Sequence, residues 1–147
     1  IREDVAEGIT SVTITGHEKR RLKNKGSERE VPVVLFGLTA LKAQLDEAQA
    51  SKSDYLFPRY NKTEKTNSNS ASAAVNKRMK ALGFEEFSAH NLRHTVKRIM
   101  RDAGVPQALR DAVQGHGGQS VAETYGRGVA LGRLERALMG ALENLVI

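Results

Sequence analysis

The sequence predicts a mainly α-helical protein with a small antiparallel β-sheet or hairpin, an α+β fold. Two observations support this class. Segments rich in β-branched residues alternate between apolar and polar side chains only within residues 9–35. From residue 37 onward, apolar residues recur at intervals of three and four, which is the period of an amphipathic helix.

The predicted hairpin consists of two strands, "ITSVTIT" from Ile9 and "REVPVVL" through Leu35. Alternation with β-branched residues is typical of a strand that is buried on one face. The connector between the strands, "GHEKRRLKNKGSE", is strongly basic. We therefore expect a hairpin whose loop carries positive charge.

Two helices should follow the hairpin. The first lies within residues 37–50. Thr39 is its candidate N-cap, and the helix carries one apolar stripe. The polar segment over residues 57–70 is rich in Asn, Ser and Thr, which is typical of a surface loop. It leads into a second helix that ends near Leu82.

Further helices are predicted in the C-terminal part. One runs from Ala89 to Ala103 and stops at "GVP", and the next starts at Pro106 and ends near Gly115. The apolar face of the first of these comprises Leu92, Val96, Ile99, Met100 and Ala103. A terminal helix carries a leucine stripe that either packs into the core or docks on a neighbouring protomer. This stripe comprises Leu131, Leu134, Leu138, Leu142 and Leu145.

The composition limits the function classes. A chain of 147 residues with 39% hydrophobic residues can bury one core, so we expect one domain over residues 1–147. Lys and Arg number 23 against 17 acidic residues, a net charge of +6 that favours a polyanionic partner such as nucleic acid. Cysteine is absent, and the sequence holds no candidate membrane span or signal peptide, so we expect a cytoplasmic protein.

The most informative stretch runs from Ser88 to Gly128. Positions 90, 93 and 97 share one helix face, so His90, Arg93 and Lys97 point the same way. Alone, such a face is typically a solvated basic surface. Two further reactive side chains, His116 and Tyr125, follow within this stretch. Ser120 and Glu123 have the spacing of a capping box, which predicts a short helix at or just before the tyrosine.

These identities and separations, with "HNLRHT" intact, resemble the second conserved box of the tyrosine recombinase (phage integrase) family. The resemblance extends upstream, where "LKNKGSEREVPV" is similar to the β-hairpin in which a catalytic lysine precedes an Arg-x-Val-Pro strand. Lys23 matches that lysine best when counted back from Pro32, and Lys25 is the alternative. One departure is Gln114, which stands where the family usually has leucine before Gly-His.

The resemblance implies a recombinase catalytic domain that cuts and rejoins DNA through a 3′-phosphotyrosine, without metal or cofactor. In-line attack on a phosphodiester builds negative charge on the non-bridging oxygens, and an arginine fork can meet two of them. Arg93 would hold the phosphate, Tyr125 would be the nucleophile and Lys23 the general acid. His90 and His116 would bind the phosphate or assist proton transfer.

The implied partner is double-stranded DNA, bound by a homotetramer of a bacterial or phage-encoded parent protein, with no role for a membrane or a small molecule. The expected phosphate contacts are Lys97, Lys25, Lys62 and Lys65. The family's first catalytic arginine should lie upstream of Ile1, as should an N-terminal DNA-clamping domain. We therefore expect the 147-residue chain to be impaired.

Three alternatives stay open. A type IB topoisomerase shares the chemistry but relaxes supercoils, and a DNA-binding module of similar fold would use the basic face without catalysis. The third is a metal-dependent hydrolase, because His90 and His94 have the spacing of a zincin pair. Against it, Asn91 stands where a zincin has glutamate, and no third ligand is evident.

Overall fold

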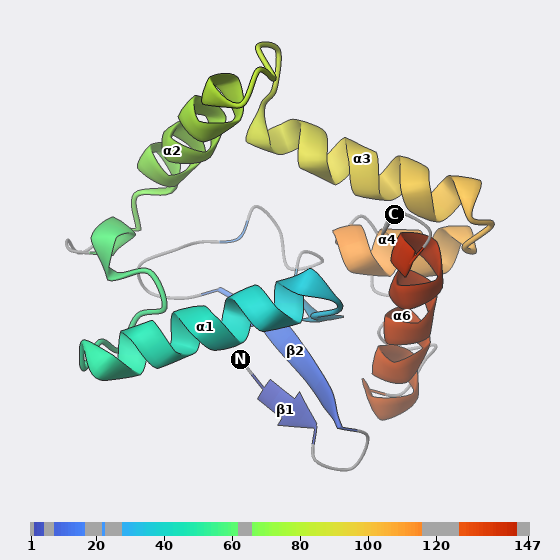
Figure 1. Ribbon diagram of the computed structural model, residues 1–147. Coiled ribbons are helices and arrows are strands. Elements are labelled where there is room, and N and C mark those ends of the chain that lie inside the picture. The colour runs from blue at the N-terminus through green and yellow to red at the C-terminus, as the bar shows by residue number, and fades with distance from the viewer. Residues whose placement is uncertain are drawn as a thin grey trace. The chain divides into compact units, whose positions relative to one another are not determined.

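The computed structural model describes most of the chain, and its helices and strands are drawn in Figure 1. It describes residues 2–4, 8–16, 22, 28–61, 66–115 and 127–143, with side chains from residue 131 onward in the last range and none in the first. The described part is mainly helical with a small antiparallel sheet, so the predicted α+β class is confirmed.

The chain divides into two compact units. Unit 1 comprises residues 1–39 and 97–147, and unit 2 comprises residues 40–96. Two helices, α1 and α3, each contribute residues to both units. The prediction of a single catalytic domain over residues 1–147 stays a prediction.

The sheet of unit 1 is antiparallel, with the described strands in the order β1-β2-β3. These strands are β1 (Arg2–Asp4), β2 (Ile9–Ile14) and β3 (Arg29–Pro32). Ile14 pairs with Arg29 and Ser11 with Pro32, so β2 and β3 form the predicted hairpin. The edge strand β1 was not predicted, because three charged residues carry no apolar alternation.

The predicted end of the second strand, Leu35, is wrong, since β3 ends at Pro32. Leu35 has a positive φ of 52°, a backbone conformation that interrupts an extended strand. The chain turns there, with the Gly37 amide donating to the Val34 carbonyl at 3.1 Å. Helix α1 (Phe36–Ala50) starts directly after this turn, so Thr39 lies inside the helix and the predicted cap at Thr39 is wrong.

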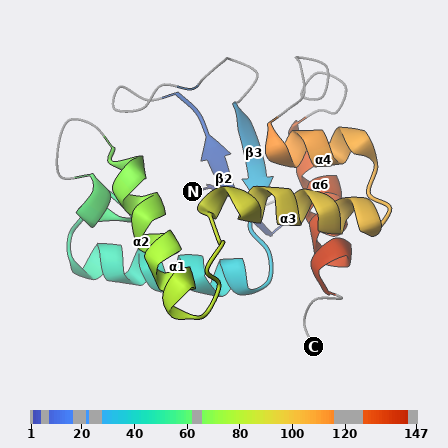
Figure 2. The same cartoon turned by 90° about the horizontal axis from the view of Figure 1, so that it is seen from above.

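Two helices cover the sheet of unit 1, α4 (Gln107–Gln114) and α6 (Arg127–Leu142). Both pack against β3, and Figure 2 shows them beside that strand. Helix α6 buries Leu131, Leu134 and Leu138, which are 3%, 5% and 6% exposed. This burial supports the interpretation of the leucine stripe as core. Leu142 is half-buried, and Leu145 lies outside the described residues.

Helix α3 (Ala89–Asp102) has the predicted position, and its apolar stripe becomes more buried toward its C-terminal end. Met100 is fully buried, Val96 and Ile99 are half-buried, and Leu92 is 51% exposed. The prediction of Leu92 and Ala103 as core residues is therefore wrong, because both are exposed and Ala103 lies after the end of the helix. Gly104, with φ of 72°, ends the helix as predicted.

Unit 2 contains most of α1, the short 3-10 helix η2 (Pro58–Tyr60) and α2 (Ser68–Ala81). Helix α2 begins before the predicted loop ends, because the Asn67 side chain accepts a hydrogen bond from the Ser70 amide at 3.0 Å and caps the helix. The predicted short helix near Tyr125 lies outside the described residues.

Candidate active site

Helix α3 carries the described members of the predicted site. The helix is continuous from Ala89 to Asp102, so His90, Arg93 and Lys97 lie on one face, as expected. His90 is exposed, whereas Arg93 and Lys97 are half-buried. A half-buried arginine presents its guanidinium from a less mobile stem than a fully exposed one, which suits recognition of an anion.

The start of α3 is fixed by side chains from outside the helix. The Asn76 side chain, from α2, accepts a hydrogen bond from the Ala89 amide at 2.8 Å. Ser88 Oγ donates to Asn91 Oδ1 at 2.7 Å across the first turn. The first four amides of a helix have no partner within it, so these bonds hold the turn that carries His90. The role of Asn76 could not be predicted from the sequence, because it joins two helices through a tertiary contact.

The rings of His90 and His94 pack edge to face, with centroids 4.7 Å apart and planes at 81°. A metal site requires at least one more ligand beside such a pair. Among the described residues, no group of three or more His, Cys, Asp or Glu side chains is close enough to hold an ion. The described geometry therefore gives the metal alternative no support.

The C-terminal end of α4 leads directly to His116. Gly115 caps the helix in the left-handed conformation, with φ of 67° and ψ of 38°, which glycine adopts without steric cost. The predicted helix end at Gly115 is confirmed. Gln114, the residue that departs from the family pattern, is only 5% exposed and occupies a core position of unit 1. A glutamine thus replaces leucine at a site that is buried.

Arg29 also belongs to this region, although no sequence pattern predicted a separate role for it. It is the first residue of β3, and its Nε donates to the Val113 carbonyl in the last turn of α4 at 3.0 Å. The two residues are 84 positions apart. The Arg-x-Val-Pro pattern marked this arginine, but no local pattern could connect it to α4.

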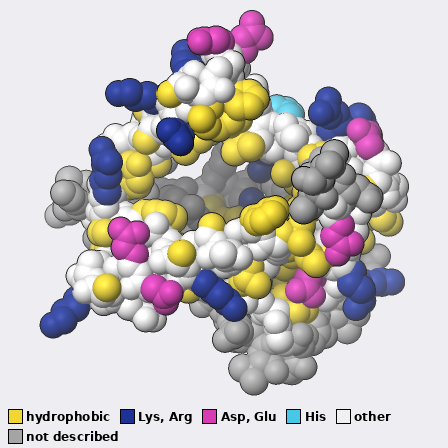
Figure 3. Space-filling model, viewed as in Figure 1, with side chains coloured by type: hydrophobic (Ala, Val, Ile, Leu, Met, Phe, Trp, Pro, Cys, Tyr) yellow, Lys and Arg dark blue, Asp and Glu magenta, His cyan; other side chains and the backbone are white. Residues whose placement is uncertain are grey.

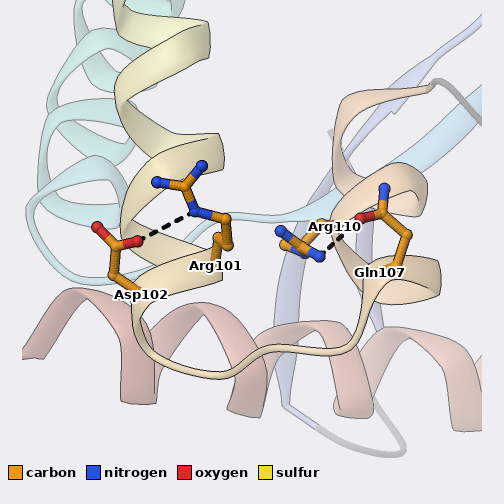
Figure 4. A network of polar contacts seen from close by, with 4 residues as sticks. All are labelled: Arg101, Asp102, Gln107 and Arg110. Atoms are coloured by element: carbon orange, nitrogen blue, oxygen red, sulfur yellow. Dashed lines mark hydrogen bonds and ion pairs between the residues drawn. The ribbon is translucent and has the colours of Figure 1, made fainter.

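Other charged side chains of α3 and α4 have partners on their own helices (Figure 4). Arg101 Nε lies 3.1 Å from Asp102 Oδ1, in a pair whose side chains are 62% and 59% exposed. Arg110 Nη2 donates to Gln107 Oε1 at 2.6 Å. The Nε of Arg110 is buried and has no hydrogen-bond partner among the described residues. The exposed pair adds little stability, because solvent screens it.

Unit 2 presents a second group of basic side chains. Lys77, Arg78 and Lys80 are exposed on α2, and Figure 3 shows Lys and Arg side chains along this helix. The signal in the sequence is the run "NKRMK", which has three positive charges within four residues. Such a cluster contributes to the basic field of the protein.

The remaining predicted site residues lie outside the described part of the chain, so their predictions stay predictions. They are Tyr125, His116, Lys23, Lys25, Lys62 and Lys65. None of the helices that the structure describes is long and apolar enough to cross a membrane.

A basic α+β domain with a histidine and an arginine on one helix face defines a class of candidate nucleic-acid enzymes. Comparison with known protein families identifies the family within this class of enzymes. The sequence pattern of the phage integrase family matches residues 4–128, which is most of the chain. The protein therefore belongs to the phage integrase family, the tyrosine recombinases. No curated protein and no solved structure gives a match.

Proposed function

We propose that the protein is a site-specific DNA recombinase of phage or prophage type, which breaks and rejoins strands through Tyr125. The observation that carries this proposal is the family match over residues 4–128. That range includes all five residues predicted to be catalytic. They are Lys23, His90, Arg93, His116 and Tyr125.

In the proposed reaction, the Tyr125 oxygen attacks phosphorus in line with the 5′-oxygen. The new bond joins the tyrosine to the 3′-phosphate, and the bond from phosphorus to the 5′-oxygen breaks. The tyrosine passes its proton to a base, for which His90 and His116 are the candidates, and Lys23 donates a proton to the departing 5′-oxygen. In rejoining, a 5′-hydroxyl attacks the phosphotyrosine and releases Tyr125.

Arg93 is proposed to hold the non-bridging oxygens of the scissile phosphate. A guanidinium can donate two parallel hydrogen bonds to such oxygens. His90 lies one turn before it on the same face of α3. His90 and His116 would add donors to the same phosphate or assist the proton transfer.

The proposed chemistry requires no external energy source. One phosphodiester is exchanged for another, so the bond energy is kept in the covalent link and no nucleotide is hydrolysed. Exchange between two duplexes cuts four strands, and each cut occupies one tyrosine. We therefore propose that four protomers assemble on the DNA, in the cytoplasm of a bacterial host.

The first experiment traps the covalent intermediate. A library of nicked duplexes with randomised sequence is incubated with the protein, and adducts are isolated under denaturing conditions. The wild-type protein and the control Tyr60→Phe should form an adduct, and Tyr125→Phe should form none. An adduct with Tyr125→Phe, or its absence with the wild type, would contradict the proposal.

A second experiment separates the recombinase from the type IB topoisomerase. With a duplex sequence recovered from the trapped adducts, a recombinase should exchange strands between two such duplexes. Relaxation of supercoiled DNA without exchange would instead support the topoisomerase.

A further inference from the structure

The side chain of Arg29 joins the hairpin to the turn that leads into His116. Its Nε donates to the Val113 carbonyl at 3.0 Å, across a contact between β3 and α4. The last carbonyls of a helix have no partner within the helix, and the negative end of its dipole lies there. A guanidinium at this position satisfies one such carbonyl and places a positive charge at the favourable end of α4.

The guanidinium of Arg29 also fills the space beside Gly115. A Cβ added at Gly115 would lie 2.6 Å from Nη1, 3.0 Å from Cζ and 3.3 Å from Cδ of Arg29. A Cβ there would force the guanidinium of Arg29 to shift and would so disturb its bond to the Val113 carbonyl. Glycine is therefore favoured at position 115 for two reasons, its positive φ of 67° and the close approach of Arg29.

Gly104 provides an internal comparison. It also has a positive φ, 72°, after the end of α3. A Cβ added there would meet nothing within 4 Å. The two glycines thus share the backbone requirement, and only Gly115 has the second, steric requirement.

Arg29 also follows the connector that contains Lys23 and Lys25, because it is the first residue of β3. The hairpin closes at the pair of Ile14 with Arg29. Next to this pair, the Glu28 carboxylate accepts hydrogen bonds from Thr15 Oγ1 at 3.0 Å and from the Gly16 amide at 3.4 Å. The base of the hairpin is therefore a defined structure, and Arg29 fastens it to the end of α4.

We propose that Arg29 is a positioning residue that fixes the Val113–Gly115 turn, and through it the placement of His116 at the scissile phosphate. The inference rests on the proposed function, because only that function gives His116 a reaction to serve. In this scheme Arg29 acts through the turn.

The test measures the single-turnover rate of the Tyr125 adduct at saturating nicked DNA, together with DNA affinity and the thermal midpoint, in the full chain. Arg29→Ala should lower the rate on the order of 100-fold, as expected for a displaced catalytic group. The affinity should stay within about threefold, because a positioning role affects the chemical step and not binding. Arg136→Ala, at an exposed arginine of α6, is the matched control and should keep the wild-type rate.

Three further comparisons make the test specific to the turn. Arg29→Lys should recover most of the rate, since an ammonium group can still donate to the Val113 carbonyl. Gly115→Ala should lower the rate at least about tenfold more than Gly104→Ala, which imposes a similar backbone strain without the clash. In the Arg29→Ala background, the effect of Gly115→Ala should shrink, because the two residues share one contact.

The outcomes distinguish failure of the proposed recombinase function from failure of the proposed positioning role of Arg29. A wild-type chain that forms no adduct contradicts the proposed function and the inference with it. A wild-type chain that forms the adduct while Arg29→Ala matches Arg136→Ala contradicts the inference alone. If Arg29→Ala fails to fold, Arg29→Lys and the two glycine variants decide, and equal rates for Gly115→Ala and Gly104→Ala overturn the inference.

Discussion

Replacement of Asn76 by alanine should destabilise the start of α3, where His90 lies. The Asn76 side chain accepts from the Ala89 amide at 2.8 Å, and both residues are half-buried. A donor left without a partner costs about 1–3 kcal/mol when buried, and partial access of water places this site near the lower end. Alanine regains about 0.5 kcal/mol of helix propensity within α2.

Asn69→Ala, at an exposed asparagine of the same helix, is the matched control because it changes the same side chain. The difference between Asn76→Ala and Asn69→Ala should be about 1 kcal/mol, or about 2–4 °C in the thermal midpoint for a chain of this size. Thermal unfolding followed by circular dichroism measures it, and hydrogen exchange of the His90 and Asn91 amides should accelerate. An Asn76→Ala variant that melts at or above the control would refute the proposed role of Asn76.

Four other substitutions test the core and the basic face. Met100→Ala removes a fully buried side chain and should cost about 2–5 kcal/mol in urea unfolding, and a cost below about 1 kcal/mol would contradict its place in the core. Ser11→Ala removes a buried hydroxyl that donates to the Glu30 carboxylate and should cost about 1–3 kcal/mol, whereas Glu30→Gln, which keeps an acceptor, should cost less. Lys97→Met should reduce the slope of log affinity for DNA against log salt by about 1, and an unchanged slope would exclude a phosphate contact.

The sequence predicted the helices of this protein well, because the burial of one face leaves a periodic pattern that is local to each helix. Helix α4 ends at Gly115 as predicted, since a left-handed cap selects glycine at a known position. The start of α1 could not be predicted, because a leucine with positive φ, Leu35, creates the turn and leucine gives no signal of that conformation. The strand β1 forms by pairing with β2, and its own three residues contain no apolar pattern.

The same distinction between local patterns and tertiary contacts applies to the candidate site. The types and spacing of His90 and Arg93 were sufficient to predict that they share a helix face, because four residues of one helix fix that geometry. The support of that helix by Asn76 depends on a contact between two helices, which no local pattern records. Residue identity thus supplies the prediction of which groups react, and the structure was needed to find the side chain that supports their helix.

The contact between Arg29 and Gly115 shows that a residue type in one sequence motif can be favoured by a side chain from another motif. Within the sequence, Gly-His and Arg-x-Val-Pro are two separate patterns, and each has a sufficient local explanation in a helix cap or a strand. In the structure, the absence of a Cβ at Gly115 is what admits the guanidinium of Arg29 to the end of α4. A left-handed cap alone would tolerate asparagine in place of glycine. Because any side chain at Gly115 would have to displace the guanidinium of Arg29, the hairpin adds to the preference for glycine that the helix cap sets.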